Sequence, residues 1–96
     1  MPAYVIADVE VTHPAGYETY RPLAAASIAR FGGRFVVRGG KADLLEGGPA
    51  PNRVVVIEFP DLDTARRWYY SDEYQAALKI RQANSTGRLI LVEGAG

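Results

Sequence analysis

The sequence predicts a single α+β domain in which a four-stranded antiparallel sheet carries helices on one face. Four short segments are rich in β-branched and aliphatic residues, and two longer segments between them show apolar residues at helical spacing. The resulting order, β-α-β-β-α-β, is that of a ferredoxin-like sandwich. A chain of 96 residues has room for one core, so residues 1–96 are expected to form one domain, with 93–96 as a loose C-terminal tail.

The first strand and the first helix are predicted from the N-terminal third of the chain. Residues 4–11 (YVIADVEV) contain no Gly or Pro and form the strand, which Thr12-His13-Pro14 ends. The helix follows because apolar residues recur three or four positions apart, at Tyr17, Tyr20, Ala24, Ile28 and Phe31. Pro22 lies inside this pattern and is expected to kink the helix or split it in two, since proline removes a backbone hydrogen bond.

The second strand lies between two Gly-Gly pairs. Gly32-Gly33 stands where a left-handed helix cap is expected, and residues 34–38 (RFVVR) then form the strand. Residues 39–52 admit two interpretations, a loop of about a dozen residues or a strand that bends at Gly39-Gly40 and resumes over 41–46. We favour the bent strand, with residues 47–52 as a hairpin turn, because long structureless loops are uncommon in compact domains.

The second half of the chain repeats the strand-helix-strand plan. Residues 53–59 (RVVVIEF) form the third strand, and Asp61 or Asp63 can cap the next helix. The buried face of that helix begins with Ala65, Trp68 and Tyr69. Ser71 is expected to cap a second helical segment, which continues through Tyr74, Ala77, Leu78 and Arg81. Residues 84–87 are predicted as a turn, and 88–92 (RLILV) as the fourth strand.

The strands are apolar on both faces, which predicts a homodimer. In the third strand Val55, Ile57 and Phe59 point one way while Val54 and Val56 point the other, and Leu89/Leu91 and Ile90/Val92 divide similarly. Helices on one face would leave an apolar patch of several hundred Å² in water, which monomers rarely tolerate. At about 25 cal/mol per Å², burying that patch stabilises a small domain by many kcal/mol. We therefore expect two copies packed sheet against sheet.

Composition excludes several classes of partner and site. Eleven basic and eleven acidic residues cancel without long like-charge runs, so neither nucleic acid nor an anionic membrane is an expected partner. Cysteine is absent and histidine occurs once, so no disulfide, thiol chemistry, metal site or cofactor is expected. The N-terminus lacks the features of a signal peptide, and no apolar run approaches the ~20 residues of a membrane span. A cytoplasmic location is therefore expected.

As a set, four motifs resemble a known family. YETYR, FGGRFVVRGG, a strand ending in IEFP, and WYYSDEYQAALKIR together resemble the uncharacterised domain-of-unknown-function family numbered 1330, of the dimeric α/β-barrel superfamily. The resemblance extends over nearly the whole chain and implies a ferredoxin-like fold and a homodimer. It implies no established reaction, because the wider superfamily includes cofactor-free monooxygenases, lactone isomerases, haem-degrading enzymes and members without known chemistry.

Three residue groups carry candidate chemistry. His13 is either a general base at a pocket mouth or an exposed loop residue. The polar aromatic residues Tyr17, Tyr20, Trp68, Tyr69, Tyr70 and Tyr74 belong either to the core or to a cavity. The third group is Arg21, Arg38 and Arg81 with Glu58. Within it Arg38, beside the backbone N–H groups of Gly39-Gly40, either grips a carboxylate or phosphate or pairs with Glu58, as Arg34 also can. Ser71 is a helix cap rather than a nucleophile, and Asp8 with Glu10 is either an acid/base pair or a set of salt-bridge partners.

The function predicted from these residues is a homodimeric domain that binds a small anionic or aromatic ligand in a pocket between helices and sheet. Tyr20 and Trp68 would form its walls, Arg38 with Gly39 would anchor an anionic group, and Tyr74 would supply a hydrogen bond. One alternative is a cofactor-independent enzyme of the monooxygenase or isomerase type, in which His13 or a tyrosine moves a proton. The other is a ligand-free structural or interaction module. Whether the chain is an enzyme is left open by the sequence.

Overall fold

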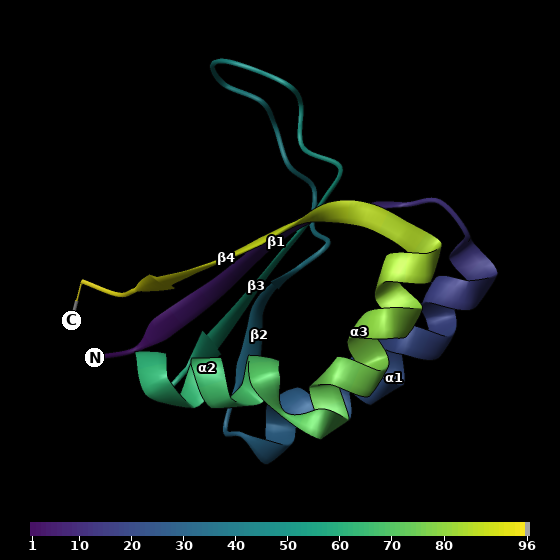
Figure 1. The fold of residues 1–96 in the computed structure, drawn as a ribbon. Coiled ribbons are helices and arrows are strands. Elements are labelled where there is room, and N and C mark those ends of the chain that lie inside the picture. Colours follow the sequence, from purple (N-terminus) through teal and green to yellow (C-terminus); the bar gives the residue numbers. More distant parts are fainter. Residues whose placement is uncertain (96) are drawn as a thin grey trace.

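The computed structural model describes residues 1–95 and has the predicted α+β architecture. Its elements are β1 (Ala3–Val11), α1 (Pro14–Arg30), β2 (Arg34–Arg38), β3 (Arg53–Phe59), α2 (Leu62–Tyr70), α3 (Asp72–Asn84) and β4 (Ser85–Glu93). The four strands pair antiparallel in the order β2-β3-β1-β4. The helices lie together on one side of this sheet (Figure 1), which confirms the ferredoxin-like arrangement.

Helix α1 is one continuous element of 17 residues. Pro22 does not split it, contrary to one of the two expected outcomes, because the buried side chains on either side of the proline, among them Tyr17 and Ile28, anchor both halves of the helix to the same core. The helix ends as predicted at the glycine pair. Gly32 has φ +74°, and the Gly33 N–H donates to the Ile28 carbonyl at 2.9 Å. Gly33 also leaves room for the Phe59 ring, since a Cβ there would lie 2.7 Å from it.

The prediction of a bent strand over residues 41–46, with a hairpin turn at 47–52, is wrong. Residues 39–52 form a loop instead, which projects away from the helices (Figure 1). Pairing with β3 ends where the Gly39 N–H donates to the Val54 carbonyl at 2.8 Å. Gly39 has φ +71° and turns the chain out of the sheet, so the residues beyond it have no strand beside them to pair with. Every residue from Gly39 to Ala50 is exposed.

The two helices that follow β3 are capped as predicted. The Asp61 carboxylate accepts from the Thr64 N–H at 2.7 Å and begins α2. The Ser71 hydroxyl oxygen accepts from the Tyr74 N–H at 3.1 Å and begins α3. One residue, Ser71, therefore separates two helices whose buried faces both reach the core.

Strand β4 is longer than predicted at both ends. It begins at Ser85 directly after α3, without the expected turn at 84–87, because the Asn84 carbonyl accepts from the N–H groups of Thr12 and His13 and holds the end of α3 beside the end of β1. At the other end Glu93 pairs with Ala3, and the Gly94 N–H donates to the Pro2 carbonyl at 2.7 Å. Residues 93 and 94 thus continue the pairing with β1 rather than forming a loose tail. The last residue of that predicted tail, Gly96, lies outside the described residues.

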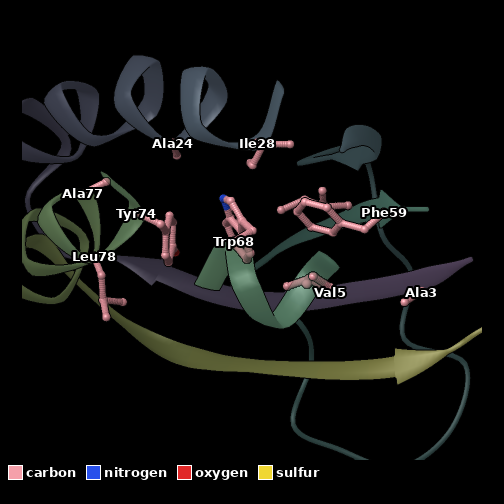
Figure 2. Close-up of a cluster of buried hydrophobic side chains, with 11 residues drawn as sticks. Ala3, Val5, Ala24, Ile28, Phe59, Trp68, Tyr74, Ala77 and Leu78 are labelled. Carbon is pink, nitrogen blue, oxygen red and sulfur yellow. The ribbon is translucent and has the colours of Figure 1, made fainter. Parts of the chain in front are cut away.

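The core fills the space between the inner face of the sheet and the helices. Its largest fully buried side chains include Trp68, Tyr74, Phe59 and Ile28, which meet between α1 and the strands (Figure 2). The outer face of the sheet is also apolar, as predicted. Val54 and Val56 are only half-buried, and Ile90 and Val92 are 45% and 44% exposed. In residues 1–95 no helix is both long and apolar enough to cross a membrane.

Candidate ligand cavity

A small cavity of about 40 Å³ lies between the inner face of the sheet and the helices. Four of the five predicted ligand-binding residues line it: Tyr20 from α1, Arg38 from β2, Trp68 from α2 and Tyr74 from α3. The fifth, Gly39, does not. Since one water molecule needs about 10–15 Å³ of such cavity space, the cavity admits a group of only a few heavy atoms.

The aromatic residues of the cavity belong to the core and to the lining at once. Trp68 and Tyr74 are 0% exposed, and their ring centroids lie 4.1 Å apart. The Trp68 indole Nε1–H donates to the Ser27 hydroxyl at 3.0 Å, and that hydroxyl donates to the Ala24 carbonyl at 2.8 Å. The two interpretations of these aromatic residues, core or pocket, are therefore not exclusive. Tyr70, by contrast, is 74% exposed and lies outside the lining.

Two tyrosine hydroxyl groups meet at the cavity. The Tyr20 and Tyr74 oxygens lie 2.9 Å apart, so one hydroxyl donates to the other. Burial raises the pKa of Tyr20 far above its ordinary value, and the neighbouring Tyr74 raises it further. Burial also raises the pKa of Tyr74, although the nearby Arg81 guanidinium opposes this shift. Both phenols are therefore protonated at neutral pH and act as hydrogen-bond donors or acceptors, not as bases.

Four arginine side chains line the cavity, and no Asp or Glu does so in the described part of the chain. Arg21 pairs with Glu18 at 3.0 Å, outside the lining. The Arg38 guanidinium stacks over the Phe35 ring, 4.2 Å from its centroid. Arg53 and Arg81 each have a buried Nε without a hydrogen-bond partner, and Arg81 is only 7% exposed. The lining is thus rich in donors and positive charge.

A β-bulge determines the direction of Arg38. Arg34 faces Glu58 across β2 and β3, and the two form an ion pair at 2.6 Å, which confirms the prediction for Arg34. The register then shifts between Phe35 and Val37, so Arg38 stands opposite Val55, in the row that faces the helices. The alternative in which Arg38 pairs with Glu58 is therefore wrong. The extra residue moves Arg38 from the outer face to the cavity.

Arg53 was not among the predicted site residues. It lies two positions before Val55 in β3, so it belongs to the same inward-facing row. A charged residue in an otherwise apolar row is the signal that would have identified it. Gly39 lies close against this arginine, because a Cβ at Gly39 would lie 2.7 Å from the Arg53 Cζ.

The remaining candidate residues lie outside the cavity lining. His13 is exposed just before α1, and its Nδ1 lies 3.2 Å from the Thr12 hydroxyl. The Asp8 carboxylate accepts from the Asn52 N–H at 2.9 Å and fastens the end of the long loop to β1. Within residues 1–95, no three His, Cys, Asp or Glu side chains gather in a way that could hold a metal ion.

Solved structures of several proteins share this fold. A protein of unknown function from Rhodopseudomonas palustris, RPA0582, superposes with a TM-score of 0.80 at 22% identity, over 99% of this chain and 83% of its own. SnoaB, a cofactor-independent oxygenase from Streptomyces nogalater, superposes with a TM-score of 0.72 at 21% identity, over 99% of this chain and 94% of its own. A dimeric ferredoxin-like protein of unknown function from Thermobifida fusca superposes with a TM-score of 0.65 at 19% identity, over 98% of this chain and 92% of its own. These similarities establish the fold.

Sequence comparison identifies the family. No curated protein matches this sequence significantly. A family model, in contrast, matches residues 2–95, which is nearly the whole chain and includes all seven elements of the fold. The chain therefore belongs to the family described as domain of unknown function (DUF1330).

Proposed function

We propose that this chain forms a homodimer through its sheet and binds a small anionic or aromatic molecule in the cavity between helices and sheet. The observation that carries the proposal is the lining of that cavity, where four arginines and a pair of tyrosine hydroxyls meet apolar walls without a carboxylate. Trp68 and Tyr20 form the walls, and Tyr74 contributes a hydrogen bond. Arg38, whose side chain is exposed, stands at the mouth of the cavity.

The size of the cavity limits the ligand. Pockets for drug-sized molecules enclose roughly 300–1,000 Å³, far more than the 40 Å³ here. The ligand is therefore a small molecule, or a larger one that places only its head group inside and extends past Arg38 toward solvent. An aromatic ring can lie against Arg38 in the same way as Phe35 does.

The outer face of the sheet supports the homodimer. Its apolar side chains are half-buried or exposed, and no helix among residues 1–95 covers them. The long loop adds a second wall on this side, because Gly48 and Pro49 border a groove of about 360 Å³ together with Ile6, Val54 and Ile90. Beyond the groove the loop presents Leu45, which is 90% exposed. A second copy of the chain would cover both surfaces, and the Thermobifida fusca protein of the same fold is described as dimeric.

Light scattering at micromolar concentration tests the homodimer. The measured mass is expected to be twice the chain mass of 10.5 kDa. A single-chain mass at that concentration would refute the homodimer without bearing on the cavity.

A thermal-shift screen with small carboxylates, aromatic acids and phosphates tests ligand binding. A binder is expected to raise Tm, because a ligand that binds only the folded state stabilises it. In Arg38→Ala the shift is expected to shrink while the dimer persists. If no compound in any class raised Tm, the proposal of a small-molecule site would fail, and an interaction module would be the better description.

A cofactor-independent oxygenase is the second candidate, since SnoaB has this fold and that activity. The cavity itself favours binding over catalysis. Both of its central tyrosines stay protonated, and His13, the single histidine, lies outside the described lining. Oxygen consumption with the compounds found in the screen tests this candidate. Turnover that is lost in His13→Ala would favour the enzyme and would require His13 to reach the ligand.

A further inference from the structure

Two arginine side chains of the cavity lining have a buried Nε–H group whose hydrogen-bonding capacity the described chain does not use. Arg81, in the last turn of α3, is 7% exposed, and Arg53 begins β3; the Nε of each is buried without a partner. We infer that Arg81 and Arg53 together bind the carboxylate of a small organic acid. This inference rests on the proposed function, and it specifies both the chemical class of the ligand and the residues that hold its charge.

The balance of donors and acceptors requires an acceptor from outside. An arginine only donates hydrogen bonds, and it has five N–H groups. The tyrosine pair has two hydroxyl hydrogens but uses one between its own oxygens, so the second is free for another acceptor. Among the described lining side chains, only the phenol oxygens of Tyr17, Tyr20 and Tyr74 accept. A group that supplies several acceptor lone pairs at once satisfies this arrangement, and a carboxylate does so.

The charge of the two arginines also favours an anionic ligand. A buried cation without a counter-charge costs several kcal/mol in folding free energy. The carbonyl end of α3 offsets part of the Arg81 charge, because the C-terminus of a helix carries partial negative charge. Neither Arg53 nor Arg81 has a carboxylate within salt-bridge distance in residues 1–95, where the two ion pairs involve Arg21 and Arg34. A bound anion would supply the missing counter-charge.

Size and shape favour a carboxylate over a phosphate. A volume of 40 Å³ holds a planar group of three heavy atoms more readily than a tetrahedral group of five. The planar fork of a guanidinium matches a carboxylate in two parallel hydrogen bonds. The rest of the lining consists largely of aliphatic and aromatic side chains, among them Val9, Ala24 and Ile57, which suit the hydrocarbon part of a short acid.

The test compares propionate with propionamide, its uncharged counterpart of the same shape, and with inorganic phosphate at equal ionic strength. At tenfold excess over Kd, propionate is expected to raise Tm by about 5–10 °C in a domain of this size. The Nε–H signal of Arg81 in ¹H–¹⁵N spectra is expected to shift on addition of propionate. Propionamide and phosphate are expected to change neither.

The substitution Arg81→Met removes the charge and keeps much of the volume. It is expected to abolish the propionate shift, while Tm without ligand stays equal or rises because the unpaired charge is gone. Arg34→Met is the matched control, since Arg34 lies outside the cavity and pairs with Glu58; it should keep the full shift. If Arg81→Met failed to fold, Arg53→Met would take its place.

Five outcomes would overturn the inference. Equal shifts with propionate and propionamide, or a propionate shift that survives in both Arg81→Met and Arg53→Met, would refute the arginine site but leave a small-molecule cavity. A shift with phosphate alone would refute the carboxylate. If none of these compounds raised Tm while aromatic compounds from the wider screen did, the inference would fail and the proposed function would stand. If no compound raised Tm in either experiment, both this inference and the proposed ligand-binding function would be refuted.

Discussion

The hydroxyl oxygens of Tyr20 and Tyr74 lie 2.9 Å apart and join α1 to α3 beside the cavity. Their contact brings together residues 54 positions apart in the chain. Burial keeps both groups protonated, so this pair contributes hydrogen bonding without charge. It is also the part of the site most open to measurement, because phenol ionisation changes the absorbance spectrum.

Alkaline pH is expected to destabilise the protein through this pair. The folded pKa of each tyrosine is raised above the ordinary value of 10.0. Their stabilisation is therefore complete below pH 10 and is lost as pH rises toward the folded pKa, because the unfolded chain releases protons that the folded chain retains. Each such tyrosine lowers the free energy of unfolding by up to about 1.4 kcal/mol per pH unit in this range. Urea unfolding at several pH values measures the slope. Tyr20→Phe should flatten it, whereas Tyr70→Phe, on an exposed side chain, is the control.

Ser27→Ala is expected to destabilise the fold by about 1–3 kcal/mol, because it leaves the buried Trp68 N–H without an acceptor. Denaturant unfolding measures the loss. Thr19→Ala, on the exposed side of the same helix, should change the free energy of unfolding by no more than about 0.5 kcal/mol. Equal effects from the two substitutions would show that the indole hydrogen bond contributes nothing specific.

Gly39→Ala is expected to lower the stability of the fold, whereas Gly40→Ala is not. Gly39 has φ +71° and lies against the Arg53 guanidinium, so a methyl group would add about 1–2 kcal/mol of backbone strain and displace that arginine. A Cβ at Gly40 would meet nothing within 4 Å, and its φ is not positive. Thermal unfolding compares the two variants. A Gly39→Ala variant as stable as Gly40→Ala, with its ligand shift intact, would disprove the close packing of Arg53.

Ile90→Asp is expected to shift the protein from dimer to monomer. It places a charge on the outer face of the sheet, where the second copy would bury it unpaired. Leu23→Asp is closely matched, because Leu23 on α1 and Ile90 on β4 are both 45% exposed. Light scattering over a concentration series should show dissociation only for Ile90→Asp. Dissociation of both variants, or of neither, would mean that the dimer does not use this face.

Leu45→Ser tests whether the long loop takes part in the dimer. Leu45 is 90% exposed in the single chain, so its loss should leave folding unchanged. If a second copy covers it, losing its burial weakens the dimer by about 1.5–3 kcal/mol, or roughly 10- to 150-fold in Kd. Analytical ultracentrifugation measures that change, with Tyr70→Ser as an exposed control on α2. An unaltered Kd would exclude the loop from the interface.

Periodicity and local chemistry together predicted most of the fold. Helix caps at Asp61 and Ser71, the glycine cap at Gly32 and the two-faced strands follow from local chemistry, and each is present in the structure. The loop over 39–52 could not be predicted from the same signals. Whether Gly39 bends a strand or ends it depends on what stands beside the chain, and an alternating pattern does not reveal a neighbour.

The lining of the candidate cavity was predictable in its aromatic residues and less so in its charged ones. Tyr20, Trp68 and Tyr74 follow from helical spacing, and all three line the cavity. The direction of Arg38 depends on a bulge in β2, which shifts the register by one residue and leaves no mark in a five-residue strand. Arg53 was missed because strand ends commonly carry charged residues. Only its position in the row of β3 that faces the helices sets it apart from such residues.

Ser71, described above as the cap between two helices, also links two of the residues that line the cavity. Its N–H and its hydroxyl both donate to the Trp68 carbonyl, at 3.2 and 2.7 Å, while its hydroxyl oxygen accepts from the Tyr74 N–H. The backbones of two cavity-lining residues, Trp68 and Tyr74, are thereby joined through one small residue. If the proposed ligand binds there, a lining held in place in this way would lose little conformational freedom on association.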